Sequence, residues 1–91
     1  MNIKKLYKII KERKQKMKKD SYVASLFRLG NDRIIQKVGE EATEVIIAAK
    51  NKNKKQIIYE VSDLIFHLLI LLASFDIDIP EIEKELESRN R

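Results

Sequence analysis

Hydrophobic residues recur at helical spacing along most of this chain, and no segment shows the strict alternation that is typical of a β-strand. The first predicted helix covers residues 3–18, where apolar residues share one side and lysines fill the other. A linking segment follows over residues 20–30. In this segment we expect Asp20 to cap a short turn that Gly30 ends.

Two long helices come next. The pattern predicts one over residues 32–50 with Asn31 or Asp32 as its cap. Asn53, with Gln56 three residues later, is typical of a capping box that starts the other, which reaches about residue 74. A second capping box, Asp78 with Glu81, begins a final helix that reaches about Arg89, and Pro80 suits its first turn.

The helix predicted up to residue 74 is apolar on more than one side, which is typical of a helix buried all round. A chain of 91 residues could hardly cover such a helix alone, so we expect a homodimer. The predicted fold is an all-α bundle of four to five helices, completed by dimerisation. Residues 1–91 are expected to form one domain.

The stretch from Ile57 to Phe75 is nearly long enough to span a bilayer. It contains Glu60, Asp63 and His67, however, and an acid near mid-membrane costs about 2.5–3.5 kcal/mol. We therefore interpret it as a buried helix of a soluble, cytoplasmic protein with no membrane partner.

Charge is uneven along the chain. Residues 1–19 carry nine lysines and arginines against one acid, Glu12, whereas the remainder is slightly acidic. Such an arm would attract phosphates, nucleic acid or an anionic surface, but a solvated lysine-rich helix face is the favoured interpretation. The chain has no cysteine, which excludes disulfides and thiolate metal sites.

Acidic residues form two clusters inside the two long apolar helices. Glu40, Glu41 and Glu44 fall on one face of the first, and Glu60 and Asp63 share a face of the second. Carboxylates among Val, Ile and Leu need partners, because burying an unpaired charge is costly. Two such faces brought together would make an oxygen-lined pocket for Mg²⁺, which can bridge a polyphosphate and activate a water.

Less specific explanations exist for each part. The pattern Glu-Glu-x-x-Glu is common on ordinary solvated helices, and Glu60 with Asp63 could form structural ion pairs with Lys37 or Arg33. A lone His67 is more often a satisfied core histidine than a ligand. Gly39 lies inside a predicted helix, which indicates that another helix or a ligand packs close to the backbone there. From sequence alone, packing by a helix is the favoured interpretation.

The chain resembles a known family in two motifs. Residues 37–45, Lys-Val-Gly-Glu-Glu-Ala-Thr-Glu-Val, resemble the central motif of the phosphoribosyl-ATP pyrophosphatase family of histidine biosynthesis. Residues 60–68, Glu-Val-Ser-Asp-Leu-Ile-Phe-His-Leu, look like its second motif. The acidic skeleton is shared across the all-α, MazG-like nucleotide pyrophosphohydrolases, whereas the Lys-x-Gly, the Phe-His and an upstream Ser-Tyr narrow the resemblance.

The resemblance implies Mg²⁺-dependent hydrolysis of phosphoribosyl-ATP to phosphoribosyl-AMP and pyrophosphate. By position, it implies these metal-binding carboxylates: Glu41, Glu44, Glu60 and Asp63. Glu40 is a further ligand, a partner of a ligand or the base that activates water, and Glu41 is also a catalytic candidate. The residues expected to contact substrate are Arg13, Ser21, Tyr22, Arg33, Lys37 and His67.

Two positions depart from the family pattern, which often has Thr at Val23 and a second lysine at Gln36. Neither position touches the acidic skeleton. The family is often fused to a cyclohydrolase, and at this length the chain is expected to be the free-standing form.

Three other functions would explain part of the sequence. A house-cleaning pyrophosphatase acting on dUTP or a damaged nucleotide would share the metal site. A basic module binding nucleic acid through residues 1–19 lacks aromatics beyond Tyr7 for base stacking, so no nucleic-acid partner is expected. A purely structural dimerisation bundle would leave Glu60 and Asp63 unexplained.

Overall fold

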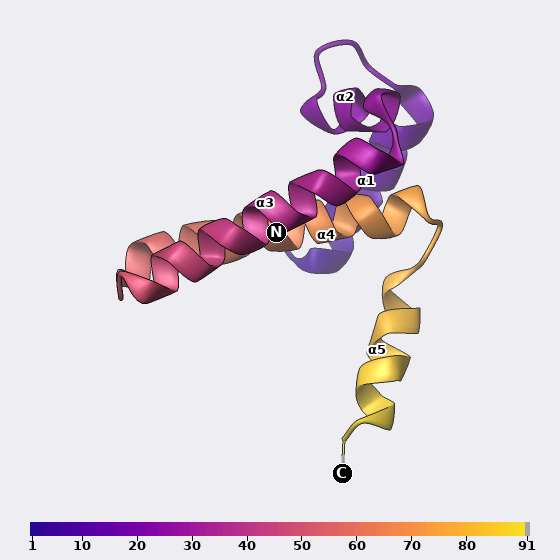
Figure 1. Cartoon of the computed structure of the whole chain (residues 1–91). Helices are drawn as coiled ribbons and strands as arrows, with labels where there is room; N and C mark the ends of the chain where they lie inside the picture. The colour runs from indigo at the N-terminus through magenta and orange to yellow at the C-terminus, as the bar shows by residue number, and fades with distance from the viewer. Residues whose placement is uncertain (91) are drawn as a thin grey trace.

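The computed structural model describes residues 1–90, and within them every regular element is an α-helix, as predicted. The helices are α1 (Ile3–Lys16), α2 (Tyr22–Leu29), α3 (Asn31–Lys50), α4 (Lys54–Ser74) and α5 (Ile79–Ser88). Figure 1 shows α3 and α4 running side by side in opposite directions, with α1 and α2 packed at one end of the pair. The last helix, α5, leaves the body at a steep angle. The single domain over residues 1–91 stays a prediction, and its last residue lies outside the described part.

The core lies where the first four helices meet. Ile10 of α1, Ile34 of α3 and Ile70 of α4 are 0%, 1% and 0% exposed. Leu26 of α2 joins the same cluster. This packing is what holds α3 and α4 together at one end, because each buried aliphatic side chain contributes about 1.5–3 kcal/mol.

The N-terminal boundaries differ from the prediction in two places. The first helix ends at Lys16, two residues early, because Met17 adopts a left-handed conformation with φ of 50°. The cap at Asp20 was wrong. Ser21 takes that place, since its Oγ accepts a hydrogen bond from the Ala24 N–H at 3.1 Å, and a two-turn helix follows.

Gly30 ends α2 as predicted, and it also begins α3. Its φ of 98° lies in the left-handed region that favours glycine, so the chain can turn there without strain. The expected side-chain cap at Asn31 or Asp32 was wrong, because both residues already lie in the first turn of α3.

Capping is as predicted for α5 and in part for α4. The Asp78–Glu81 box is present, and the Asp78 N–H donates to the Glu81 carboxylate at 2.9 Å. At α4 the Gln56 N–H donates to the Asn53 side chain at 3.1 Å, which is one half of the predicted box.

Helix α4 is long and apolar enough to cross a membrane by length and composition, but only 28% of its most apolar window is buried within this chain. The buried residues of α4 are His67, Leu69, Ile70 and Ala73, and many of its other apolar residues remain partly exposed. No part of residues 1–90 packs on Gly39, since a Cβ there would meet nothing within 4 Å, and a ligand or a second copy at this position stays a prediction. Burial of α4 on all sides therefore needs a surface from outside this chain.

Candidate metal site

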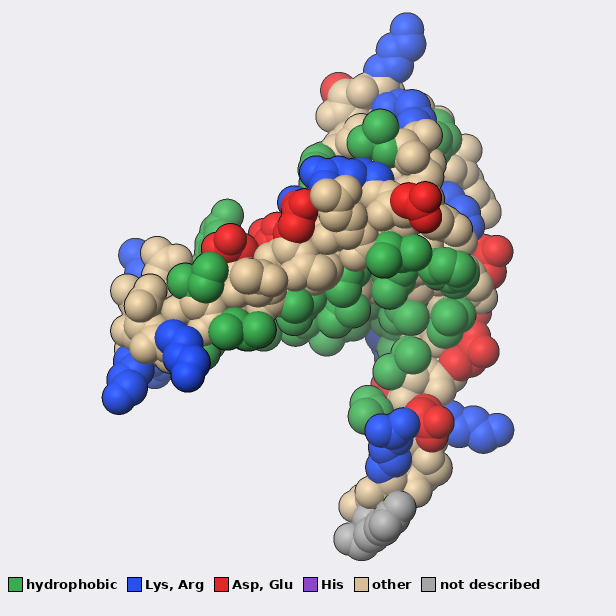
Figure 2. Space-filling model, in the orientation of Figure 1, with side chains coloured by type: hydrophobic (Ala, Val, Ile, Leu, Met, Phe, Trp, Pro, Cys, Tyr) green, Lys and Arg blue, Asp and Glu red, His purple; other side chains and the backbone are tan. Residues whose placement is uncertain are grey.

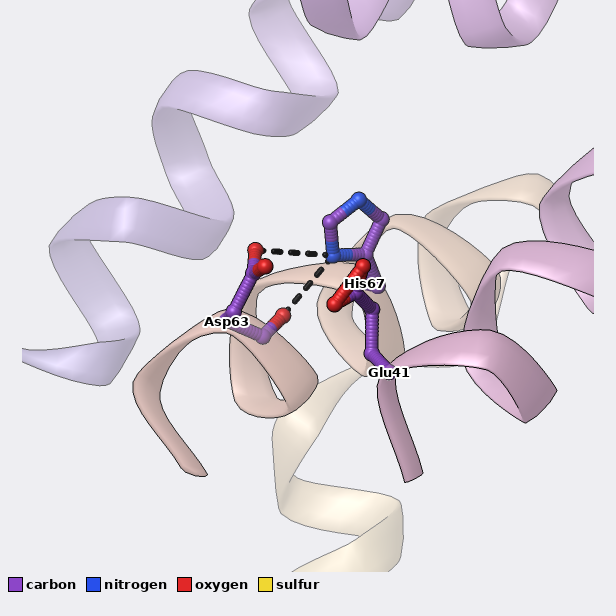
Figure 3. Close-up of side chains that lie close together, drawn as sticks. All are labelled: Glu41, Asp63 and His67. Atoms are coloured by element: carbon purple, nitrogen blue, oxygen red, sulfur yellow. Dashed lines mark hydrogen bonds and ion pairs between the residues drawn. The ribbon is translucent and has the colours of Figure 1, made fainter. Parts of the chain in front are cut away.

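Three potential ligands converge between α3 and α4. Carboxylate oxygens of Glu41 and Asp63 and a ring nitrogen of His67 all lie within 4.8 Å of one another. Figure 3 shows Glu41 reaching from α3 toward the Asp63 and His67 side chains of α4. Because Asp63 and His67 are four residues apart, one helical face presents both. The predicted meeting of the two polar stripes is present in the structure.

Glu41 and Asp63 form a coupled acid pair. Burial alone would raise the pKa of Glu41, but hydrogen bonds with Asp63 and Lys37 outweigh burial and lower it. Burial raises the pKa of Asp63, and so do its hydrogen bond to Glu41 and the negative charge there. The two carboxyl groups are therefore close enough to shift each other's pKa. A divalent cation between them would offset their mutual repulsion.

Glu44 and Glu60 complete the acidic group. Loss of hydration raises the pKa of Glu60, and the charges of Glu44, Glu41 and Asp63 raise it further. Glu41, Glu44 and Asp63 therefore all lie within electrostatic reach of Glu60. Like charges at close range are costly, and a hard cation with oxygen ligands relieves that cost.

Two cations lie beside the acids on α3. Lys37 Nζ is 3.2 Å from a Glu41 oxygen and 3.6 Å from a Glu40 oxygen. Arg33 contacts the other Glu40 oxygen at 3.3 Å. Burial would lower the pKa of Lys37, but the hydrogen bond to Glu41 and the nearby negative charges raise it. Glu40 is exposed and turns toward these two cations, which distinguishes it from Glu41.

His67 lies behind the acids rather than at the surface. It is 3% exposed, and its Nδ1 is 3.2 Å from an Asp63 carboxylate oxygen and 2.8 Å from the Asp63 carbonyl. Its Nε2 is 2.9 Å from the Tyr22 hydroxyl. Phe66 stacks on the Tyr22 ring with centroids 6.3 Å apart. The hydrogen-bonded series Tyr22–His67–Asp63 was not predicted from the sequence. The four-residue spacing of Asp63 and His67 could have indicated the contact between those two residues.

The remaining substrate candidates are Ser21 and Arg13, and among residues 1–90 neither side chain hydrogen-bonds or pairs with the acidic group. Ser21 is buried and caps α2 through its Oγ, so its hydroxyl is already engaged. Arg13 lies near the C-terminal end of α1, and among residues 1–90 no ion pair of its side chain is recorded. Contact of either residue with substrate stays a prediction, as do the roles of Tyr22, Arg33 and Lys37.

Comparison with known proteins gives a consistent result. The family described as phosphoribosyl-ATP pyrophosphohydrolase matches residues 3–90. The chain is 52% identical to a phosphoribosyl-ATP pyrophosphatase of Leptospira biflexa over 94% of each chain. It is 54% identical to one of Listeria innocua, over 92% of this chain and 81% of the relative. A histidine biosynthesis bifunctional protein HisIE of Caldanaerobacter subterraneus is 54% identical over 93% of this chain and 42% of its own length.

Proposed function

The chain belongs to the phosphoribosyl-ATP pyrophosphohydrolase family, and on that premise we propose that it hydrolyses phosphoribosyl-ATP to phosphoribosyl-AMP and pyrophosphate. Family membership makes the chain a hydrolase, and the names of its relatives connect it with histidine biosynthesis. The observation that carries the chemistry is the convergence of Glu41 and Asp63, from two helices, at the centre of a group of four carboxylates.

The donor set fits Mg²⁺. Hard oxygen ligands are what this ion prefers. The neighbouring carboxylates raise the pKa values of Glu60 and Asp63, and a bound cation would offset that repulsion. Glu41, Glu44, Glu60 and Asp63 would hold it. When bound, the ion would neutralise phosphate charge and make a nearby water more acidic.

Neighbouring side chains supply the other parts of the reaction. Lys37 and Arg33, now paired with Glu40 and Glu41, are close enough to the acids to bind phosphate oxygens beside them. Glu40 is exposed next to the group and is the candidate for accepting the proton of the attacking water. Water attacks the α- or the β-phosphorus, and the bond between that phosphorus and the bridging oxygen breaks. Phosphoribosyl-AMP and pyrophosphate are released, and Glu40 takes the proton of the water.

His67 holds Asp63 in place rather than touching the substrate. Its ring is buried, with one nitrogen on Asp63 and the other on Tyr22. Partners of this kind orient a ligating carboxylate and are often needed for full metal affinity. This differs from the substrate contact expected from sequence, and it leaves the exposed Tyr22 ring beside the site.

A homodimer is the proposed assembly. Five apolar residues of α4 and the Phe75 that follows it recur at spacings of four and three, and none of them is fully buried: Ile57, Val61, Leu64, Leu68, Leu71 and Phe75. This spacing is typical of a helix that packs along another helix. The corresponding stripe of a second copy is the partner that the pattern fits.

Two further proposals, on nucleic-acid binding and on cellular location, follow from the ion pairs of α1 and from the acids of α4. Two lysines of the basic arm, Lys11 and Lys14, pair with Asp78 and Asp76 of the same chain, which argues against a nucleic-acid partner. We place the enzyme in the cytoplasm, since the acids of α4 pair with groups of α3 rather than facing lipid.

The test is pyrophosphate release from phosphoribosyl-ATP with Mg²⁺ or with EDTA, beside ATP and dUTP. We expect fast, Mg²⁺-dependent release from phosphoribosyl-ATP alone. Release from dUTP or ATP instead would contradict the proposed substrate and keep the acidic site. No release from any of the three would contradict the proposal itself.

A further inference from the structure

The last helix is only partly covered by its own chain. No residue of α5 is buried, and Ile82 and Leu86, one turn apart, are 39% and 62% exposed. A ten-residue helix in water is marginal unless tertiary packing covers its apolar side. Something beyond residues 1–90 of one chain must therefore cover α5.

An apolar groove runs along the inner side of α5. Its volume is about 280 Å³. Apolar side chains of three helices line most of it: Ile3, Leu69, Leu72, Ile79, Ile82 and Leu86. Figure 2 shows hydrophobic side chains along the α3–α4 pair continuing into the angle at which α5 departs. We call this angle, between α4 and α5, the elbow.

Contacts with α1 hold the elbow open. Lys11 Nζ lies 3.0 Å from an Asp78 carboxylate oxygen, and Lys14 Nζ lies 3.0 Å from one of Asp76. Lys14 also donates to the Ala73 carbonyl at 2.8 Å, and the Tyr7 hydroxyl donates to the Ile77 carbonyl. These bonds tie the α4–α5 connection to α1 and so fix the direction in which α5 leaves the body.

A second uncovered region is the tip of the α3–α4 pair, residues 46–59. Ile47, Ile58 and Tyr59 are 48%, 58% and 66% exposed there. The tip carries four lysines and no acid between residues 50 and 55, whereas α5 carries four glutamates and one lysine. The two regions are complementary in charge and both have exposed apolar residues. In one chain the tip and the end of α5 lie at the far ends of two diverging arms (Figure 1), so they do not meet there.

Two-fold symmetry brings them together. If the α4 stripe packs on the same stripe of a second copy in antiparallel fashion, the start of one helix lies beside the end of the other. The tip of each copy then reaches the end of its partner's α4, where α5 begins. We propose that the elbow of each copy holds the basic tip of the other, with α5 covering it.

This inference rests on the proposed homodimer and specifies its contacts. Charge reversal tests it without touching the acidic site. One chain carries Lys54→Glu and Lys55→Glu, which fall in the first turn of α4, where acids suit the helix dipole. The other carries Glu83→Lys and Glu87→Lys, which leave the Asp78–Glu81 capping box intact. Circular dichroism checks that each chain folds.

Dimer dissociation constants are measured at low salt for each chain alone and for an equimolar mixture. Each reversed chain should dissociate at least about tenfold more readily than the unaltered chain, and the mixture should form heterodimers that restore the original constant. Unchanged dimerisation without a preference for heterodimers would overturn the elbow contact and leave the homodimer standing. If the unaltered chain stays monomeric at every concentration, both the elbow contact and the homodimer are overturned. The proposed activity is tested separately, by pyrophosphate release.

Cysteine cross-linking gives an independent readout that needs no loss of affinity, because the chain has no cysteine of its own. Ile58→Cys and Ile82→Cys chains are mixed and oxidised. A disulfide-linked pair between the two should form readily. The control mixes Ile58→Cys with Ile9→Cys on exposed α1, and equal linkage in both mixtures would contradict the proposal.

Discussion

The two ends of the α3–α4 pair differ in what surrounds them. At one end α1 and α2 pack on the pair, Ile34 and Ile70 are at most 1% exposed, and the acidic group lies in reach of its partners. At the tip, residues 46–59, Ile46 and Ile58 are 59% and 58% exposed. The packed end is complete within one chain, because its polar groups and its core are both satisfied there. The tip exposes apolar residues of the kind found at protein interfaces, but nothing in its own chain covers them.

The same contrast, between satisfied polar groups and uncovered apolar residues, is found between two faces of α4. One side carries Glu60, Asp63 and His67 toward α3, and the other carries the apolar stripe that includes Leu68. Within residues 1–90, no buried side-chain nitrogen or oxygen lacks a hydrogen-bond partner. The polar side is therefore organised before any ligand arrives, whereas the apolar side depends on a second copy.

Removing one carboxylate from the packed end should have the largest effect. Glu41→Gln or Asp63→Asn should reduce pyrophosphate release from phosphoribosyl-ATP at least about a thousandfold, because the charge that holds Mg²⁺ is lost. Helicity and dimerisation should persist, as measured by circular dichroism and light scattering. Near-normal turnover in either variant would mean that the metal face is assigned wrongly.

Placing a charge in the apolar stripe should break the other side of α4. Leu68 is 37% exposed, so Leu68→Glu should leave the monomer folded and raise the dimer dissociation constant about a hundredfold. Analytical ultracentrifugation measures this. Ser62→Glu, at an exposed position of the same helix, is the matched control and should dimerise normally. Equal dimerisation of both variants would argue against the stripe.

Removing the support behind Asp63 should have an intermediate effect. His67→Phe keeps a ring of similar size but loses both nitrogens, so Mg²⁺ affinity or turnover should fall about 10- to 100-fold. Tyr22→Phe removes only the hydroxyl at the outer end of the chain and should have a smaller effect. Titration of activity with Mg²⁺ separates affinity from maximal rate. A rise in KM for substrate alone would instead favour direct contact.

The acid pair should make stability depend on pH and Mg²⁺. The pKa values of Asp63 and Glu60 lie above their ordinary 3.8 and 4.5, so their stabilisation is present below those values and is lost as pH rises through the raised ones. The lowered pKa of Glu41 acts oppositely, since its contribution is lost only as pH falls. In EDTA, the contribution of Asp63 and Glu60 to the melting temperature should therefore decline as pH rises from about 4.

Mg²⁺ should reverse this decline, with an increment that grows as pH rises, because the cation competes with protons for the carboxylates. Thermal unfolding from acidic to neutral pH, with EDTA or Mg²⁺, measures both. Asp63→Asn should flatten the EDTA profile. A Mg²⁺ increment independent of pH would show that these carboxylates do not hold the ion.

The smallest effect concerns Gly39, beside the acids. Since a Cβ there meets nothing within 4 Å, Gly39→Ala should stabilise the fold by about 0.5–1 kcal/mol in urea unfolding. Ala49→Gly, exposed on the same helix, should cost a similar amount. Destabilisation by Gly39→Ala would show that a second copy packs closely at this position.

The sequence by itself determined the features that depend on near neighbours. Helical spacing gave the all-α fold, the Asp78–Glu81 box gave the start of α5, and spacings of three and four gave the shared faces of the carboxylates. Such features follow from backbone periodicity and from hydrogen bonds within one turn, so no distant contact is needed to predict them.

Only the tertiary structure decided which groups meet across helices. It paired Glu41 with Asp63, joined Tyr22 to His67, and directed α5 away from the body. It also placed Ser21, not Asp20, at the N-cap of α2, and Gly30, not Asn31 or Asp32, at the N-cap of α3. These outcomes depend on the rotation and crossing of packed helices, which core contacts such as Ile10 with Ile70 set and which no local pattern encodes.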